Sequence, residues 1–187
     1  GVDNGSVEQL TIDLQRRYAE TSSQVKFVEL DVPFNFAEIV NYGVEQSTAD
    51  HVVLLNNDIQ IINFDWLESL LEHSQRPEIG AVGGKLYYPD DTIQHAGIVV
   101  GIGDYAGHPH KHEQGGFSGY INRLNVIQNV SAVTGAMLMC KTAVYREVGG
   151  LNAEHFKVAC NDVDFCLRLI EQGNRNVFTP FAQVYHH

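Results

Sequence analysis

Hydrophobic and polar residues recur along the chain with two periods, and these predict that helices and strands alternate. Apolar residues at helical spacing predict helices over residues 7–20 and 35–47, while short apolar or alternating runs predict strands over 25–30 and 51–58. The same criteria predict the remaining elements in this order: a helix over 64–77, strands over 78–88, 94–102 and 131–141, helices over 142–150 and 161–174, and a strand over 175–187. Because strands and helices alternate, we expect an α/β domain with a mostly parallel central sheet flanked by helices.

One predicted strand ends on a polar cluster. The run VVLLNND over residues 52–58 begins as a strand that should be buried on both faces and stops at Asn56, Asn57 and Asp58. Open α/β sheets bind ligands beyond the carboxyl ends of their strands, where a carboxylate can hold a hard divalent cation. Asn and Asp after a strand are also ordinary turn residues, so the pattern alone leaves both interpretations open.

A second acidic cluster opens the helix predicted over 161–174. Asn161 or Asp162 suits the N-cap, and Asp164 suits the positive end of the helix dipole. The alternative is that one of these carboxylates acts as a general base that takes a proton from an attacking hydroxyl.

Histidines occur at two further places. His186 and His187 follow an apolar and aromatic strand, and His108, His110 and His112 alternate in the Gly- and His-rich loop over 103–118. Alternating histidines in such a loop are weak evidence for a metal site, and a solvated loop that closes over a substrate is the favoured interpretation.

Composition limits the classes of partner. The 187 residues carry a formal net charge of −11, with 19% charged and 44% hydrophobic residues. A protein that binds nucleic acid needs a basic surface, so we expect no nucleic-acid partner. No apolar run is long enough for a membrane span. Cys140, Cys160 and Cys166 have no metal-like spacing, and we expect them to be reduced thiols.

The motifs, taken in order, resemble a known family. The runs are FNFAEIVNYGVEQSTADHVVLLNND, IGAVGGKLYYPDDTIQHAGIVVG, AVTGAMLMCKTAVYREVGGLNAEHF and NDVDFCLRLIEQGNRNVFTPFAQVYHH. In this order and spacing they resemble the inverting family 2 glycosyltransferases, which have the GT-A fold of nucleotide-diphospho-sugar transferases. The likeness extends over nearly the whole chain.

The resemblance implies a domain organisation. Val2-Asp3-Asn4-Gly5-Ser6 matches the end of the second strand of such enzymes, so the first strand is expected to be missing and the domain incomplete at its N-terminus. Residues 1–187 would then form one GT-A domain, with a partial nucleotide-binding half over 1–60 and an acceptor and catalytic half over 61–187. In this scheme Asp3 contacts the nucleoside, and the truncated chain itself is a candidate for an inactive fragment.

The resemblance also implies roles for the polar clusters. Asn56, Asn57 and Asp58 fall on the family's DxD-type motif, so Asp58 is expected to bind Mg²⁺ or Mn²⁺ while Asn56 and Asn57 contact the nucleotide-sugar. His186 matches a histidine that completes metal or diphosphate binding. Asp162 matches the catalytic base.

Further expectations concern substrates. Thr134 and Gly135 match a stretch that lines the donor-sugar side. The implied reaction is metal-assisted hexosyl transfer, with inversion, from a nucleotide-diphosphate sugar to a saccharide or lipid-linked saccharide acceptor. The likeness of QHAGIVVG and its loop to bacterial rhamnosyltransferase-like members implies polysaccharide biosynthesis. The expected location is the cytoplasm, or the inner face of the membrane through the acceptor or missing segments.

Two alternatives to this function remain. Asn at positions 56 and 161, where the family more often has acids, is compatible with a non-catalytic carbohydrate-binding module that keeps the fold. A nucleotidyltransferase is a poorer alternative, because it would need a glycine-rich phosphate loop with a basic residue near the chain start. The sequence leaves the sugar, the linkage, the metal and the oligomeric state open.

Overall fold

The computed structural model describes residues 1–187. Its elements are, in chain order, β1 (Val2–Asp3), α1 (Gln9–Thr21), β2 (Val28–Glu29), α2 (Phe36–Glu45), β3 (His51–Leu55), β4 (Ile59–Ile61), α3 (Trp66–Ser74), β5 (Ile79–Tyr87), β6 (Ile93–His95), β7 (Val99–Val100), β8 (Ala106–Gly107), the 3₁₀ segment η1 (Tyr120–Asn125), β9 (Gln128–Val130), β10 (Met137–Lys141), α4 (Thr142–Glu147), α5 (Asn161–Glu171) and β11 (Arg175–His186). All five predicted helices are present. None of the helices is both long enough and apolar enough to cross a membrane.

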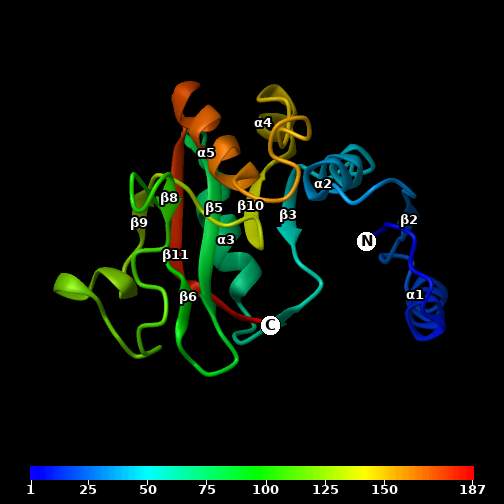
Figure 1. Ribbon diagram of the computed structural model, residues 1–187, viewed down its shortest axis with the longest axis horizontal. Helices are drawn as coiled ribbons and strands as arrows, with labels where there is room; N and C mark the ends of the chain where they lie inside the picture. The colour runs from blue at the N-terminus through cyan, green and yellow to red at the C-terminus, as the bar shows by residue number, and fades with distance from the viewer.

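A seven-stranded sheet organises the molecule. Its main path is β3-β10-β5-β11-β4, with β6 beside β5 and β9 beside β11 (Figure 1). Within it only β5 and β11 pair in parallel, and the other pairs are antiparallel. The α/β class with helices around a central sheet is confirmed, but the expected mostly parallel sheet is corrected to a mixed one.

The reason for this correction is the position of β10. Because β10 is antiparallel to both β3 and β5, those two strands run in the same direction, as strand–helix–strand connections require. However, β10 lies between them, so they are not hydrogen-bonded neighbours. The alternation of elements predicted the common direction of β3 and β5 correctly and could not predict the strand inserted between them.

β3 is an edge strand, which changes its burial. Val52 and Leu54 are buried, whereas Leu55 is 44% exposed. The expected burial on both faces is confirmed for the face of Val52 and Leu54 only. On the other face Val53 is partly buried against a second cluster and Leu55 is exposed, and the strand pairs only with β10. The apolar run indicated a strand correctly but not its place in the sheet.

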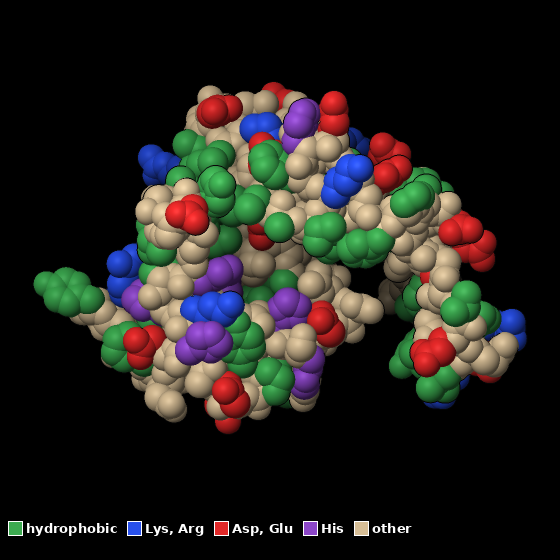
Figure 2. Space-filling model, viewed as in Figure 1, with side chains coloured by type: hydrophobic (Ala, Val, Ile, Leu, Met, Phe, Trp, Pro, Cys, Tyr) green, Lys and Arg blue, Asp and Glu red, His purple; other side chains and the backbone are tan.

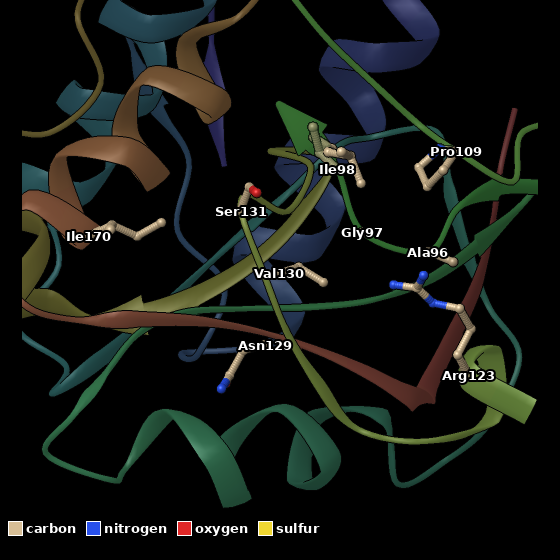
Figure 3. Close-up of a pocket in the computed structure, with 10 residues that line it drawn as sticks. Ala96, Gly97, Ile98, Pro109, Arg123, Asn129, Val130, Ser131 and Ile170 are labelled. Atoms are coloured by element: carbon tan, nitrogen blue, oxygen red, sulfur yellow. The ribbon is translucent and has the colours of Figure 1, made fainter. Parts of the chain in front are cut away.

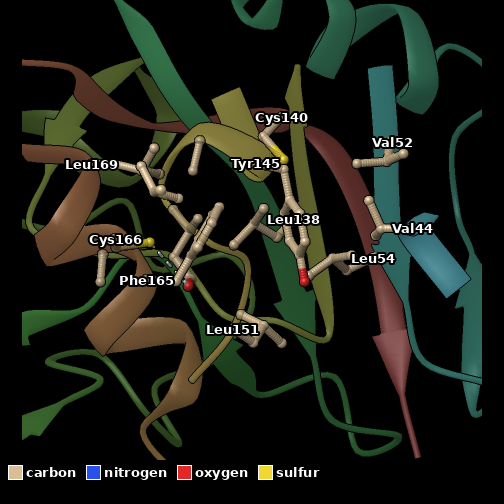
Figure 4. Packing of buried hydrophobic residues seen from close by; sticks show 14 of the residues in the cluster. Val44, Val52, Leu54, Leu138, Cys140, Tyr145, Leu151, Phe165, Cys166 and Leu169 are labelled. Atoms are coloured by element: carbon tan, nitrogen blue, oxygen red, sulfur yellow. Dashed lines mark hydrogen bonds between the residues drawn. The ribbon is translucent and has the colours of Figure 1, made fainter. Parts of the chain in front are cut away.

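Two hydrophobic clusters cover the two faces of the sheet. On one face, α5 packs Phe165, Cys166 and Leu169 against strand residues that include Leu138 and Cys140 (Figure 4). On the other face, Leu70 of α3 packs with a second set of strand residues: Val82, Met137, Met139, Val177 and Val184. Successive side chains of a strand point to opposite faces, which explains why neighbours such as Leu138 and Met139 belong to different clusters.

The first 30 residues stand apart from this sheet (Figure 1). β1 and β2 form a separate two-stranded parallel sheet, and α1 has no buried residue. The apolar stripe that predicted α1 is exposed: Val7 is 93%, Leu10 78% and Leu14 48% accessible. The helix is confirmed, but its stripe packs on no other element.

Candidate active site

A cavity of about 300 Å³ lies where five segments meet, one of them the start of α2. β3 and β10 are antiparallel neighbours, so the residue after β3 lies beside the residue before β10, and the Asn56 amide N–H donates to the Ala136 carbonyl at 3.1 Å. The start of α5 and the end of β11 complete the walls. The lining residues are Phe34, Phe36, Asn56, Thr134, Gly135, Ala136, Val158, Ala159, Cys160, Asn161, Asp162 and His186.

His186 lines this cavity and contacts Asp58 beside it, and we call this part of the cavity the metal end. β4 pairs with the end of β11 so that Ile59 lies opposite His186, which places Asp58 next to that histidine. His186 Nε2 lies 3.2 Å from Asp58 Oδ1 and 3.2 Å from Asn56 Nδ2. The pairing of β4 with β11 thus joins two clusters that are far apart in the sequence.

Gln94 of β6 determines which nitrogen of the His186 ring carries a proton. Its Oε1 lies 2.6 Å from His186 Nδ1, and an amide oxygen can only accept, so Nδ1 carries the proton. In the neutral ring Nε2 then holds a lone pair, which accepts from Asn56 and faces the oxygen of Asp58. A nitrogen lone pair opposite a carboxylate oxygen is an arrangement that a shared cation stabilises.

The protein offers only part of a coordination shell at this end. No group of three or more His, Cys, Asp or Glu side chains is arranged to hold a metal ion. Two protein ligands nevertheless fit a divalent cation of the Mg²⁺ type, which keeps several positions for water and substrate phosphate oxygens. The donor set of Asp58 and His186 therefore fits such an ion, provided that a ligand completes its shell.

The other end of the cavity carries Asp162, and we call it the base end. Asp162 Oδ2 accepts from the Gly135 amide at 2.9 Å, and Oδ1 accepts from the Val163 amide at 2.8 Å. Asp162 is in the first turn of α5, where the helix dipole favours negative charge. The carboxylate is fixed by backbone groups while its side chain still lines the cavity.

The neighbouring acid, Asp164, forms an ion pair within α5. Its Oδ2 lies 2.7 Å from Arg168 Nη2, one helical turn further on. Arg168 also donates to the carbonyls of Val148 and Gly150. This network ties α5 to the turn after α4, so Asp162 is the carboxylate of the pair that remains available to a ligand.

The expected N-cap at this helix is wrong. Cys160 occupies the N-cap position in a left-handed conformation with φ of 62°, and Asn161 is already the first helical residue. Asn161 is buried, and its amide donates to the Val158 carbonyl at 3.0 Å. The Asp162 side chain is directed to Gly135 and Val163 instead of capping the helix.

Of the other predicted site residues, some line the cavity and some lie outside it. Thr134 and Gly135 line the cavity, with Thr134 Oγ1 accepting from the Ala136 amide at 3.3 Å. Asn57 is exposed in the turn between β3 and β4, outside the lining. Asp3 is also outside it: this carboxylate accepts from the Ser6 amide at 2.9 Å, and its hydrogen bonds to Ser6 lower its pKa. Its contact with a nucleoside stays a prediction.

Sequence reasoning gave no role to Gln94 or His95, and it named His108 only as a weak metal candidate in a loop expected to close over substrate. Gln94 and His95 are consecutive in β6, so their side chains point in opposite directions, the first to His186 and the second to His108. The only available signal was the dipeptide itself, and nothing in it indicates either partner.

A larger hollow of about 350 Å³ lies elsewhere and has a different character (Figure 3). Its lining contains small, aliphatic and amide side chains, and Arg123 is the only charged one. It contains neither a carboxylate nor a histidine. Of these two cavities, only the smaller one is lined by a carboxylate and a histidine, Asp162 and His186.

Comparison with known proteins decides the family. The model of the family described as glycosyl transferase family 2 matches residues 2–149. The chain belongs to this family. The match includes Asp58 and Gly135 but ends before Asp162 and His186, so within this family 2 domain the roles of those two residues rest on other arguments.

Relatives of this family 2 domain are longer proteins. The chain is 44% identical over 186 residues to the uncharacterized protein y4gI of Sinorhizobium fredii, and 36% identical over 189 residues to the O-antigen biosynthesis protein RfbC of Myxococcus xanthus. Each alignment covers 100% of this chain, but only 20% of the first relative and 14% of the second. The chain thus spans a fifth or less of the length of these relatives.

A solved structure establishes the fold class of the family 2 domain. The mannosyltransferase PcManGT from Pyrobaculum calidifontis, in complex with GDP-Man and Mn²⁺, superimposes with a TM-score of 0.67 at 17% identity. The superposition covers 99% of this chain and 46% of that one. The GT-A fold expected from the sequence is confirmed.

Proposed function

We propose that this domain transfers a hexosyl unit, with inversion, from a nucleotide-diphosphate sugar to a saccharide hydroxyl. The observation that carries the proposal is that Asp162, His186 and Asn56 line one cavity, with Asp58 in contact with His186. A cation site and a base in one hollow are what a displacement at a sugar carbon requires.

In this proposal Asp162 is the general base. It takes the proton of the acceptor hydroxyl, whose oxygen forms a bond to the anomeric carbon from the side opposite the diphosphate. The bond from that carbon to the diphosphate oxygen breaks, and its electron pair leaves with the diphosphate. Attack from the opposite side inverts the anomeric configuration.

Asp58 and His186 would hold Mg²⁺ or Mn²⁺ at the other end. When bound there, such an ion neutralises charge on the diphosphate and so improves it as a leaving group. Gln94 keeps the His186 lone pair on Nε2, and Asn56 and Thr134 offer polar groups to the donor. The Mn²⁺ in the complex of PcManGT supports this part of the proposal.

The acceptor class is proposed from the relatives. The name of RfbC assigns that protein to O-antigen biosynthesis, which supports a saccharide acceptor from bacterial polysaccharide assembly. A cytoplasmic location, and an acceptor carried on lipid, stay predictions from the sequence.

The decisive experiment separates binding from turnover. A panel of UDP-, GDP- and dTDP-sugars is tested for Mn²⁺-dependent release of nucleoside diphosphate, for the wild type and for Asp162→Asn. We expect Asp162→Asn to lose turnover by about 10²–10⁴-fold, the usual contribution of a general base, while nucleoside-diphosphate binding stays intact.

Asp164→Asn is the matched control, because it changes the neighbouring acid that the Arg168 network occupies. We expect it to lower stability with little effect on turnover of the folded enzyme. Equal turnover for Asp162→Asn and the wild type would remove Asp162 as the base. Saccharide binding without metal dependence or transfer would favour a carbohydrate-binding module instead.

A further inference from the structure

A second polar cavity lies outside the candidate active site. Its volume is about 330 Å³, and it lies between the turn after β5, the loop over 114–116 and the end of β11. It shares no lining residue with the cavity that contains Asp162 and His186, which we call the active-site cavity. We call the second hollow the tyrosine pocket, and its polar lining consists of Tyr87, Asp91, Gln114, Gln183 and Tyr185.

The two tyrosine rings are neighbours in this pocket. Tyr87 and Tyr185 are register partners in the parallel pair of β5 and β11, so their side chains lie on the same face of the sheet. Their ring centroids are 6.2 Å apart, and the ring planes are inclined by 54°. The face of an aromatic ring carries partial negative charge, which attracts the C–H groups of a ligand. The rings thus offer a surface for the carbon skeleton of a ligand.

Contacts within the protein hold the walls of the tyrosine pocket in place. Lys85 is only 2% exposed, and its Nζ lies 5.3 Å from the centroid of the Tyr87 ring and donates to the Gly115 carbonyl at 3.4 Å. The Tyr185 hydroxyl donates to Asp91 Oδ1, and this hydrogen bond raises the pKa of Tyr185, so the hydroxyl stays protonated. Gly115 fits closely, because a Cβ there would lie 2.5 Å from the Asp91 carbonyl oxygen. The walls are therefore formed before a ligand enters.

Several polar groups of the pocket have no partner in the protein. The Asp91 carboxylate is engaged only through Oδ1, and its Oδ2 makes no hydrogen bond. Gln183 donates from Nε2 to the Pro180 carbonyl at 2.9 Å and leaves Oε1 open. The side chain of Gln114 makes no hydrogen bond, although it lines the pocket. A carboxylate oxygen and amide groups in one hollow can accept from hydroxyl groups and donate to them.

The chemistry of the lining favours one class of ligand. No lysine, arginine or histidine lines the tyrosine pocket, and Asp91 would repel a phosphate group, so a nucleotide is disfavoured there. By contrast, histidine side chains gather around the recess visible in Figure 2, and His186 lines the active-site cavity. A neutral saccharide has C–H faces that pack on aromatic rings and hydroxyl groups that pair with carboxylates and amides.

We propose that the tyrosine pocket is a second saccharide-binding site, which holds a neutral sugar unit outside the active-site cavity. Tyr185 and His186 are consecutive in β11, so their side chains point to opposite sides of the strand, and each lines a different hollow. A saccharide with one unit in the tyrosine pocket is therefore kept at the domain without filling the active-site cavity. This inference goes beyond the proposed function, because binding here needs no metal, nucleotide or turnover.

Amide NMR tests where a saccharide binds. The protein, without nucleotide or metal, is titrated with the neutral probes maltotriose, cellotriose, mannotriose and chitotriose. We expect at least one probe to shift the signals of Gly115 and Gly116, which line the tyrosine pocket, while Gly135 reports on the active-site cavity. Shifts confined to Gly135, or no shift with any probe, would overturn the proposal. Absence of transferase activity would refute the proposed function and leave this result standing.

Variants of the carboxylate test the polar side of the pocket. Asp91 has a left-handed φ of 64°, which asparagine also tolerates, so Asp91→Asn removes the charge and keeps the backbone. We expect the affinity for the probe to fall by about tenfold, because a hydrogen bond to a charged group is lost, and Gln114→Ala to have a smaller effect. Asp90→Asn is the matched control, since Asp90 lies outside the lining and asparagine can still accept from Thr92.

Variants of Tyr185 test the aromatic side. Tyr185→Leu removes the ring and should weaken binding by about tenfold, whereas Tyr185→Phe keeps the ring and should bind better than Tyr185→Leu. Phe181→Leu, an exposed aromatic of the same strand outside the pocket, is the control. Dispersed amide spectra show that each variant is folded. Wild-type affinity in both Asp91→Asn and Tyr185→Leu would overturn the proposal.

Discussion

The two ends of the cavity are built by different means. At the metal end, side chains from two strands and a turn contact one another: His186 meets Asn56, Asp58 and Gln94. At the base end, Asp162 is held by two backbone N–H groups at the start of a helix. Side-chain contacts can rearrange when a ligand enters, whereas a backbone cradle keeps its geometry. We therefore expect the metal end to adapt to its ligands and the base end to be preorganised.

The strongest test of this difference is Asp58→Asn at the metal end. The substitution keeps the shape of the side chain but removes its charge, so we expect Mn²⁺-dependent binding of nucleoside diphosphate to weaken by more than about 100-fold. Calorimetric titration with Mn²⁺ present and absent measures this. Asp104→Asn, an exposed carboxylate in the loop, is the control, and unchanged metal dependence in Asp58→Asn would refute the assignment.

A smaller effect at the same end is expected for Gln94→Leu. Without an acceptor for His186 Nδ1–H, the ring is free to rotate and to change tautomer. Loss of a residue that hydrogen-bonds a metal ligand in this way costs about 10–100-fold in metal affinity. Gln94→Glu keeps the acceptor and should retain binding. The same Mn²⁺ titration would contradict the role of Gln94 if Gln94→Leu matched the wild type.

Near the base end, Arg168→Met separates stability from chemistry. The side chain of Arg168 is 26% exposed and holds Asp164 and two carbonyls, so we expect its removal to lower the free energy of unfolding by about 1.5–3 kcal/mol. Turnover of the folded fraction should persist, because Asp162 is held by other groups.

Urea unfolding of Arg168→Met is compared with that of Arg16→Met. The Arg16 pair with Asp13, at 3.5 Å, has side chains that are 62% and 54% exposed, and its loss should change stability by less than about 1 kcal/mol. Equal destabilisation by the two variants would show that the network around Arg168 contributes no more to the free energy of unfolding than an exposed ion pair does.

The smallest predicted effect is a dependence of stability on pH. Burial lowers the pKa of His95 well below its ordinary 6.5, and the nearby His108 adds to this. The unfolded chain therefore binds more protons below pH 6.5, so stability is complete above this pH and falls as the pH is lowered toward the folded pKa. The slope for one histidine is at most about 1.4 kcal/mol per pH unit.

His95→Asn checks this dependence. His73, His108 and His110 also have lowered pKa values and contribute to the slope in the wild type. Urea unfolding at several pH values should therefore give a shallower but not flat profile in the variant. A slope as steep as that of the wild type would exclude His95 as a contributor.

Local sequence patterns predicted the helices and strands better than they predicted which strands pair with each other. The amphipathic pattern over 161–174 and the breaker Gly173 correctly indicated α5 at Asn161–Glu171. In contrast, β4 has only three residues, and no periodicity can indicate so short a strand. Its pairing with β11, about which the sequence is silent, is what brings Asp58 to His186.

The candidate site shows the same limit. Asp58, Asp162 and His186 were found because their motifs resemble those of a family, and periodicity alone favoured turn and cap residues at two of these positions. Gln94 lies 92 residues from His186 in the sequence, and His95 lies 13 residues from His108. Both contacts depend on where β6 joins the end of β5, a long-range packing outcome that local propensity does not encode.

The position of β11 has a consequence for how the protein is made. This strand pairs with β5, β9 and β4, yet it follows all the other strands of this sheet in the sequence. Until the ribosome has released it, β5 has one open edge, α3 and α5 lack a continuous surface to pack on, and both are exposed to chaperones and to other nascent chains. Quality control during translation should therefore recognise a domain that still lacks β11 by its unpaired strand edge.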